Sequence, residues 1–86
     1  MKVVNKYTHT KTQNDVYIGR GSKWGNPFII GIHGDRREVI RKYREYIVDN
    51  HKLLDSLEEL KGKTLVCFCA PQACHGDILC ELVETL

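Results

Sequence analysis

The sequence has no apolar run that approaches the roughly 18–20 residues that a membrane-spanning helix needs. Its opening residues, MKVVNKYTHT, lack the long apolar stretch of a secretory signal peptide. Internal repeats, low-complexity tracts and linkers are absent as well. These absences predict a cytoplasmic protein with no membrane partner.

The sequence also has little excess charge of either sign. Its formal net charge of +2, from 13 Lys and Arg against 11 Asp and Glu, is too small to indicate nucleic-acid binding. Up to Phe28 there is a single acid, Asp15, and the basic residues are Lys2, Lys6, Lys11, Arg20 and Lys23. Soon after follow Arg36, Arg37 and Arg41. Much of the positive charge therefore flanks the glycine-rich segment from Gly19 to Phe28.

The cysteines are too close together to join distant loops through disulfide bonds. All of them fall within one short stretch, as Cys67, Cys69, Cys74 and Cys80. In a chain without a signal peptide, clustered cysteines indicate metal ligation, a reactive thiolate or plain core packing. A disulfide-stapled secreted fold is a poor fit, and a reducing compartment is expected.

The length of 86 residues allows one domain, over residues 1–86. A composition of 42% hydrophobic and 28% charged residues is typical of soluble globular proteins and argues against disorder, coiled coil and collagen. Residue patterns predict strands over Lys2–Thr8 and Asp15–Ile18, followed by helices over Asp35–Val48 and Lys52–Leu60. A strand over Thr64–Cys69 and a helix over Cys74–Leu86 come last. The order β-β-α-α-β-α predicts a small α/β fold of two or three layers that contains a βα unit.

Local signals mark the ends of these elements. Asp35 is a candidate N-cap, with Glu38 three residues later completing a capping box, and Gly62 stops the second helix. The run from Thr64 to Cys69 is nearly continuously apolar, which is typical of a central strand buried on both faces. In open α/β sheets ligands bind outside the carboxyl ends of the strands. The segments after Ile18 and after Cys69 should meet there if both strands end at one edge.

The first of these segments, IGRGSKWGNPF, suits an anionic ligand. Glycines let backbone N–H groups approach an anion, and a base can stack on Trp24. Charge and short polar groups come from Arg20, Lys23, Ser22 and Asn26. The alternative is a tight structural loop with Trp24 as a core anchor. The segment fits neither the Walker nor the dinucleotide-binding fingerprint.

The second segment, CFCAPQACHGDIL, has three competing uses. Zinc would be held by Cys67, Cys69, Cys74 and His75, but a C-x-C pair within a strand is a poor chelate, so we expect no metal. A nucleophilic Cys74 would need a base from elsewhere, such as His33, because adjacent helix residues point about 100° apart. The third use is recognition of phosphate or ribose by His75 and the free N–H groups near Gly76, at a helix N-terminus. Cys80, on the apolar stripe, should pack in the core.

Together these motifs resemble an uncharacterised family of small bacterial and phage proteins, domain of unknown function 4326. The resemblance covers nearly the whole chain. It marks Gly19, Arg20, Ser22, Trp24, Gly25, Asn26, Pro27 and Phe28, then Gly34, Asp35 and Arg36, then Cys67, Cys69, Pro71, Cys74, His75, Gly76 and Asp77. Phe68 departs from it, because tryptophan is the more frequent residue there. The resemblance implies no established activity, but it implies that the two segments form a site and makes a role between phage and host plausible.

The leading prediction is a protein that binds a small phosphorylated nucleotide-type ligand, as a phage protein that sequesters a host nucleotide signal would. The predicted ligand-binding residues are Gly19, Arg20, Ser22, Trp24, Gly25, Asn26, Cys69, His75, Gly76 and Asp77. One alternative is a small hydrolase or transferase acting on a nucleotide or ADP-ribose-like substrate, with Cys74, His75 or Asp77 in the chemistry. Another is a zinc-stabilised interaction module. No cofactor is expected, a homo-oligomer should complete the pocket, and the location would be the host cytoplasm if a phage encodes the chain.

Overall fold

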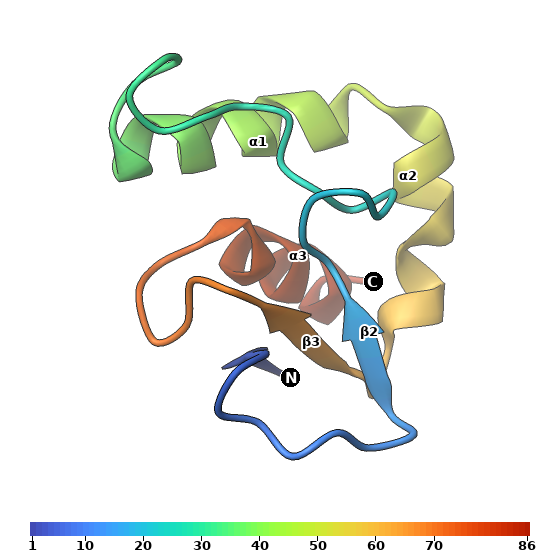
Figure 1. Ribbon diagram of the computed structural model, residues 1–86. Coiled ribbons are helices and arrows are strands. Elements are labelled where there is room, and N and C mark those ends of the chain that lie inside the picture. The colour runs from blue at the N-terminus through green and yellow to red at the C-terminus, as the bar shows by residue number, and fades with distance from the viewer.

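The computed structural model describes all residues, 1–86 (Figure 1). Its elements follow the order strand, strand, helix, helix, strand, helix that the sequence predicts. They are β1 Lys2–Asn5, β2 Asp15–Tyr17, α1 Arg36–Val48, α2 His51–Ser56 with the 3-10 turn Leu57–Leu60, β3 Thr64–Cys67 and α3 His75–Glu84. No helix is long and apolar enough to cross a membrane.

The strands form a parallel sheet in the order β1-β3-β2. Val3 of β1 and Val16 of β2 both lie level with Leu65 of β3, so all the strands run in one direction and end at one edge. Leu65 and Val66 are buried although successive strand residues point to opposite faces. The prediction of a central strand buried on both faces is therefore confirmed for β3.

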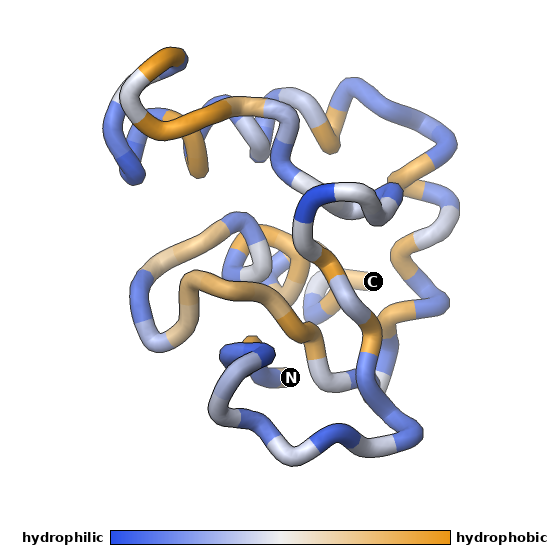
Figure 2. Tube along the Cα trace, viewed as in Figure 1, coloured by the Kyte–Doolittle hydropathy of each residue, from blue (hydrophilic) through white to orange (hydrophobic).

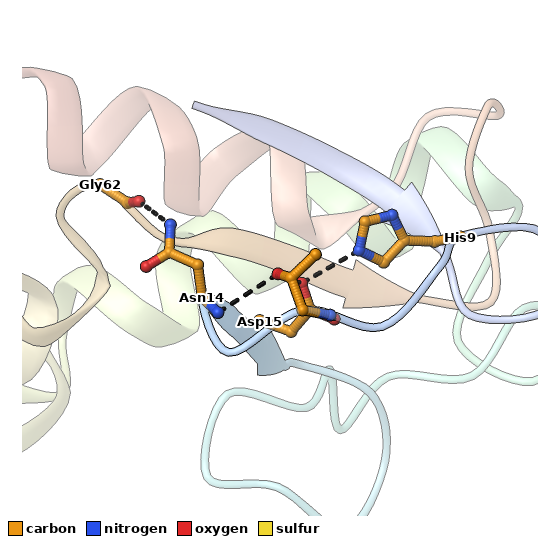
Figure 3. Close-up of polar contacts among 5 residues, drawn as sticks. His9, Asn14, Asp15 and Gly62 are labelled. Carbon is orange, nitrogen blue, oxygen red and sulfur yellow. Dashed lines mark hydrogen bonds and ion pairs between the residues drawn. The ribbon is translucent and has the colours of Figure 1, made fainter.

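The helices lie on one face of the sheet, so the α/β fold has two layers. Leu65 and Cys67 belong to the core cluster that includes residues of all three helices, whereas Val66 points away from it. Figure 3 views the sheet with the helices behind it and with the chain between β1 and β2 in front. That chain has to cross from the end of β1 to the start of β2, because the two strands are parallel and flank β3.

β1 is shorter than the strand predicted over Lys2–Thr8. The Asn5 side chain accepts a hydrogen bond from the Tyr7 N–H, and the Asn5 carbonyl accepts from the N–H groups of Thr8 and His9. Asparagine stabilises turns through such local bonds. β3 is also shorter than predicted, ending at Cys67.

Side-chain hydrogen bonds hold the crossing segment to the sheet (Figure 3). His9 Nε2 lies 3.0 Å from Asp15 Oδ1, and Thr12 donates to the same carboxylate through its N–H and its hydroxyl. The backbone bond from Thr12 is the main cause of the lowered pKa of Asp15. Asn14 Nδ2 donates to the carbonyl of Gly62. His9, to which the sequence assigns no role, thus has a structural one.

The predicted helix ends are confirmed in part. Asp35 accepts a hydrogen bond from the Glu38 N–H as the N-cap of α1. The reciprocal bond of a capping box is missing, because the Glu38 carboxylate pairs with Arg41. The helix predicted over Lys52–Leu60 begins at His51, after the N-cap Asn50, and tightens into a 3-10 turn at Leu57.

The hydrophobic core fills the space between the sheet and the helices. Its largest fully buried side chains include Trp24, Tyr43 and Ile47. Figure 2 shows hydrophobic residues along β3 and the segment that follows it. Cys80 is half-buried and packs against this core, and burial raises the pKa of its thiol.

Candidate functional site

A pocket of about 250 Å³ opens where the two unusual segments meet. Gly19, Arg20 and Asn26 line it from the glycine-rich segment, and Cys69 and His75 line it from the segment after β3. Because β2 and β3 are parallel neighbours, their carboxyl ends lie side by side (Figure 1). The prediction that the two segments come together is therefore confirmed.

Two arginines line this pocket, and neither forms an ion pair. Arg20 Nη1 donates to the carbonyl of Asn26 at 3.1 Å, and Arg36 Nη1 donates to the carbonyl of Ala73 at 3.0 Å. The structure pairs neither guanidinium with a carboxylate. Carbonyl bonds orient each group and leave its positive charge uncompensated. Arg36 is absent from the predicted ligand-binding set, although the Gly34-Asp35-Arg36 motif and the early basic residues point to it.

The surroundings of the pocket favour an anion. None of its 15 lining residues is Asp or Glu, and 10 are hydrophobic. Arg36 is the first residue of α1 and His75 the first residue of α3, so both helices begin at the pocket. A helix N-terminus carries a partial positive charge. The helix ends and the arginines therefore contribute positive potential to the same small space.

The polar residues of the glycine-rich segment shape the loop itself. Ser22 Oγ donates to the Gly19 carbonyl at 2.7 Å and does not line the pocket. A Cβ on Gly25 would lie 2.9 Å from the same carbonyl, so the turn requires glycine there. The Asn26 amide donates to the Val39 carbonyl and accepts from the Phe28 N–H, which ties the loop to α1. Of these residues, Gly19 and Asn26 line the pocket. Ser22 and Gly25 do not line it and instead stabilise the tight turn of the loop.

Trp24 lies in the core and does not line the pocket. Only 2% of its surface is exposed, and it belongs to the core cluster. Its carbonyl accepts a hydrogen bond at 2.7 Å from the Tyr43 hydroxyl, whose pKa is raised by burial. The prediction that a base stacks on Trp24 is wrong, and the alternative of a core anchor is right. Anchoring the loop on α1 excludes the indole from the pocket.

Two of the three candidate catalytic residues form the N-cap of α3. Cys74 Sγ accepts a hydrogen bond from the Gly76 N–H at 3.2 Å, and Asp77 Oδ2 accepts from the Cys74 N–H at 3.1 Å. This is a capping box with a sulfur acceptor. Burial raises the pKa of the Cys74 thiol to about 12, with Cys67 nearby contributing in the same direction. The Cys74 thiol is therefore protonated near neutral pH. Asp77 does not line the pocket.

His75 joins the two segments. Its Nε2 lies 2.6 Å from the Ile18 carbonyl, which can only accept, so Nε2 carries the proton. The ring makes an edge contact with Tyr43, with centroids 4.9 Å apart. Burial lowers the pKa of His75, so the ring is neutral near pH 7 and Nδ1 is an acceptor. Because Nε2 donates its proton to the Ile18 carbonyl, it is not free to bind a phosphate, contrary to its predicted role.

Gly76 is required for packing. A Cβ there would lie 2.8 Å from Ile18 Cδ1 and 2.9 Å from Val3 Cγ2. Gly76 does not line the pocket, and its N–H is bound to Cys74 Sγ. Of the N–H groups near Gly76 that are expected to hold phosphate or ribose, that of Gly76 itself is therefore not free, because Cys74 Sγ accepts its hydrogen bond.

Three of the four cysteines, Cys67, Cys69 and Cys74, line the pocket. Cys67 and Cys74 have their sulfurs 3.5 Å apart, and the Cys69 N–H donates to Cys67 Sγ at 3.4 Å. All cysteines are free thiols. No group of three or more His, Cys, Asp or Glu side chains is arranged to hold a metal ion. His75, the fourth candidate ligand, is held by Ile18 instead.

Several residues of the pocket are missing from the predicted set. Aromatic walls come from Tyr17, Phe28 and Phe68, and an aliphatic wall comes from Ile30 and Ile40. Phe28 was marked by the family resemblance, and Tyr17 and Phe68 stand at strand ends beside the two segments. Position next to a predicted strand end is thus the signal that identifies them, since their residue types alone suggest core packing.

Comparisons with known proteins agree with the motifs. The profile of a family described as a domain of unknown function (DUF4326) matches residues 2–85. An uncharacterised 12.4 kDa protein in the nrdA-td intergenic region of Enterobacteria phage T4 is 37% identical over 89 residues, covering 99% of this chain and 79% of the relative. No solved structure matches the chain. The chain therefore belongs to the family of domain of unknown function DUF4326, as its two motifs predict.

Proposed function

We propose that the protein binds a small phosphorylated nucleotide-type ligand in the pocket and holds it without turning it over. The observation that carries this proposal is the pair Arg20 and Arg36, whose guanidinium groups line one pocket without a carboxylate partner. Arginine binds phosphate through charge-assisted, often bidentate hydrogen bonds. The hydrophobic remainder of the wall suits the less polar part of such a ligand.

The roles of the candidate catalytic groups favour binding over catalysis. A nucleophilic cysteine needs a lowered pKa, and burial raises the pKa of Cys74 to about 12. Asp77 caps α3, and the Nε2 proton of His75 is bound to the Ile18 carbonyl. The similarity to a phage protein supports the narrower proposal that the chain sequesters a nucleotide signal of the host cell.

A second copy of the chain would complete the pocket. The cavity of about 250 Å³ is open on one side. Ile30 lines it, and the neighbouring Ile29 and Ile32 are 40% and 72% exposed. Figure 2 shows this hydrophobic stretch projecting beside α1. Native mass spectrometry tests the point: a dimer is expected with ligand bound, and a monomer at every ligand concentration would contradict it.

Calorimetric titration tests the binding proposal directly. The titrants are nucleotides, cyclic nucleotides and ADP-ribose derivatives. At least one should bind, and Arg36→Ala should weaken its binding about 10- to 150-fold, the usual worth of a hydrogen bond to a charged group. Arg37→Ala is the matched control, because Arg37 neighbours Arg36 but does not line the pocket.

Arg20→Ala completes the test. This variant should weaken binding of the same titrant by a similar factor. The melting temperature of the variant should also be measured, because Arg20 stabilises the loop through its hydrogen bond to the Asn26 carbonyl. Chromatography of the recovered ligand separates binder from enzyme, since a sequestering protein returns the ligand unchanged. The proposal fails if no titrant binds, or if Arg36→Ala and Arg37→Ala have equal effects.

A further inference from the structure

Three aromatic rings form an exposed surface beside the pocket, which we call the aromatic platform: Tyr7, Tyr17 and Phe68. The ring of Phe68 lies between the other two, with centroids 5.2 Å from Tyr7 and 6.0 Å from Tyr17. Their exposed fractions are 83% for Tyr7, 36% for Tyr17 and 44% for Phe68. The rings of Tyr7 and Tyr17 are tilted by 49° and 77° relative to that of Phe68, so a planar group can stack on one ring face at a time, and Tyr7 is the most exposed of the three.

A lysine makes the platform positive. Lys6 Nζ lies 5.2 Å from the ring centroid of Tyr17 and 5.6 Å from that of Phe68, within cation–π range. Lys6 forms no ion pair. The carboxylate of Asp15, which lines a second pocket together with Lys6 and Tyr17, is already bound to His9 and Thr12. The platform therefore combines stacking surface with an uncompensated positive charge.

The platform is continuous with the pocket. Tyr17 and Phe68 line the pocket as well as the platform. The reason is topological: Tyr17 is the last residue of β2 and Phe68 directly follows β3, so the two lie side by side at the edge where the pocket opens. A ligand that leaves the pocket at this point meets the aromatic rings.

The small size of the pocket favours such an extension. Its volume of about 250 Å³ is below the range of about 300–1,000 Å³ in which proteins enclose drug-sized ligands. A nucleotide whose phosphate lies between the arginines can therefore extend toward the opening of the pocket, where its base meets the adjoining surface. The adjoining surface that is aromatic and positive is the platform.

We infer that the aromatic platform binds the base of a nucleoside phosphate whose phosphate lies between Arg20 and Arg36. This inference rests on the proposed function and adds to it the place where the base binds, at the exposed end of the ligand. Stacking on aromatic rings tolerates any base, so the platform supplies affinity and the pocket selects the phosphate.

Two probes test the inference, adenosine 5′-monophosphate and ribose 5-phosphate, which share the sugar phosphate and of which only the first carries a base. The nucleotide should bind at least about fivefold more tightly, from the usual contribution of base stacking. Tyr7→Ala should remove much of that advantage and leave the affinity for ribose 5-phosphate unchanged, because Tyr7 is 83% exposed and does not line the pocket. Tyr7→Phe keeps the ring and should bind both probes like the wild type.

The outcomes separate this inference from the proposed function. If Arg36→Ala weakens both probes but they bind the wild type equally well, the pocket stands and the platform is refuted. Equal weakening of both probes by Tyr7→Ala also refutes it. Failure of both probes to bind the wild type overturns the inference together with a phosphate-binding pocket. If a single-stranded oligonucleotide binds and depends on Tyr7 but not on Arg36, the platform is a separate nucleic-acid surface and the inference is wrong.

Discussion

Replacing Gly76 with alanine tests whether close packing of α3 on the sheet determines the residue at this position. The added Cβ would lie 2.8 Å from Ile18 Cδ1, and 2.9 and 3.0 Å from the Cγ2 and Cγ1 atoms of Val3. Real side chains essentially never approach so closely, so Val3, Ile18 or the helix itself has to move. Both neighbours extend from the sheet toward the core, where little free space is available.

The magnitude is the difference between two opposing effects. Overpacking a well-filled core costs about 1–3 kcal/mol. Alanine in place of glycine favours a helix by up to about 1 kcal/mol. We therefore expect Gly76→Ala to lower the free energy of unfolding by up to about 2 kcal/mol, which lowers the melting temperature of a domain of this size by up to roughly 16 °C.

A double-mutant cycle isolates the packing effect. Val3→Ala removes two of the three atoms that the new Cβ would meet, the methyl groups of Val3, and leaves Ile18 Cδ1 in place. Each single variant should destabilise the protein, whereas the double variant should be at least about 0.5 kcal/mol more stable than the sum of the two effects predicts. Urea unfolding followed by circular dichroism measures all four proteins. The packing argument is refuted if Gly76→Ala stabilises the protein, as helix propensity alone predicts, or if the two effects simply add.

The start of α3 supports two more predictions. Cys74→Ser should leave the free energy of unfolding within about 0.5 kcal/mol of the wild type, because a hydroxyl can accept a hydrogen bond from the Gly76 N–H in place of sulfur. Cys74→Ala should lower the free energy of unfolding by about 1 kcal/mol. Equal urea midpoints for the two variants would contradict the capping role. For His75, burial lowers the pKa in the folded protein, so the unfolded chain binds the proton first as the pH falls. The contribution of His75 to stability should therefore be complete above the unfolded pKa of about 6.5 and decrease as the pH falls below it. His75→Gln should reduce this dependence of the melting temperature on pH, measured in thermal melts across the same pH range. An unchanged dependence would exclude His75 as its source.

The sequence alone determined the order of the elements and the position of the site. Alternation and helical spacing are local properties, so they identified the strands and helices and the N-cap Asp35. The apolar run of β3 indicated burial on both faces, which only a central strand has. Parallel strands that end at one edge then brought the glycine-rich segment and the segment from Cys67 to Asp77 together.

Only the tertiary structure decided which side chains face the pocket. Trp24 and Arg20 are four positions apart in the same loop, but the core takes the indole and the pocket takes the guanidinium. Arg36 reaches the pocket because its helix begins beside Ala73, which is distant in sequence. The bond between His75 and Ile18 likewise joins residues that no local pattern relates. Local patterns fix the backbone of each element, whereas the direction of a loop side chain depends on what the rest of the chain packs against it.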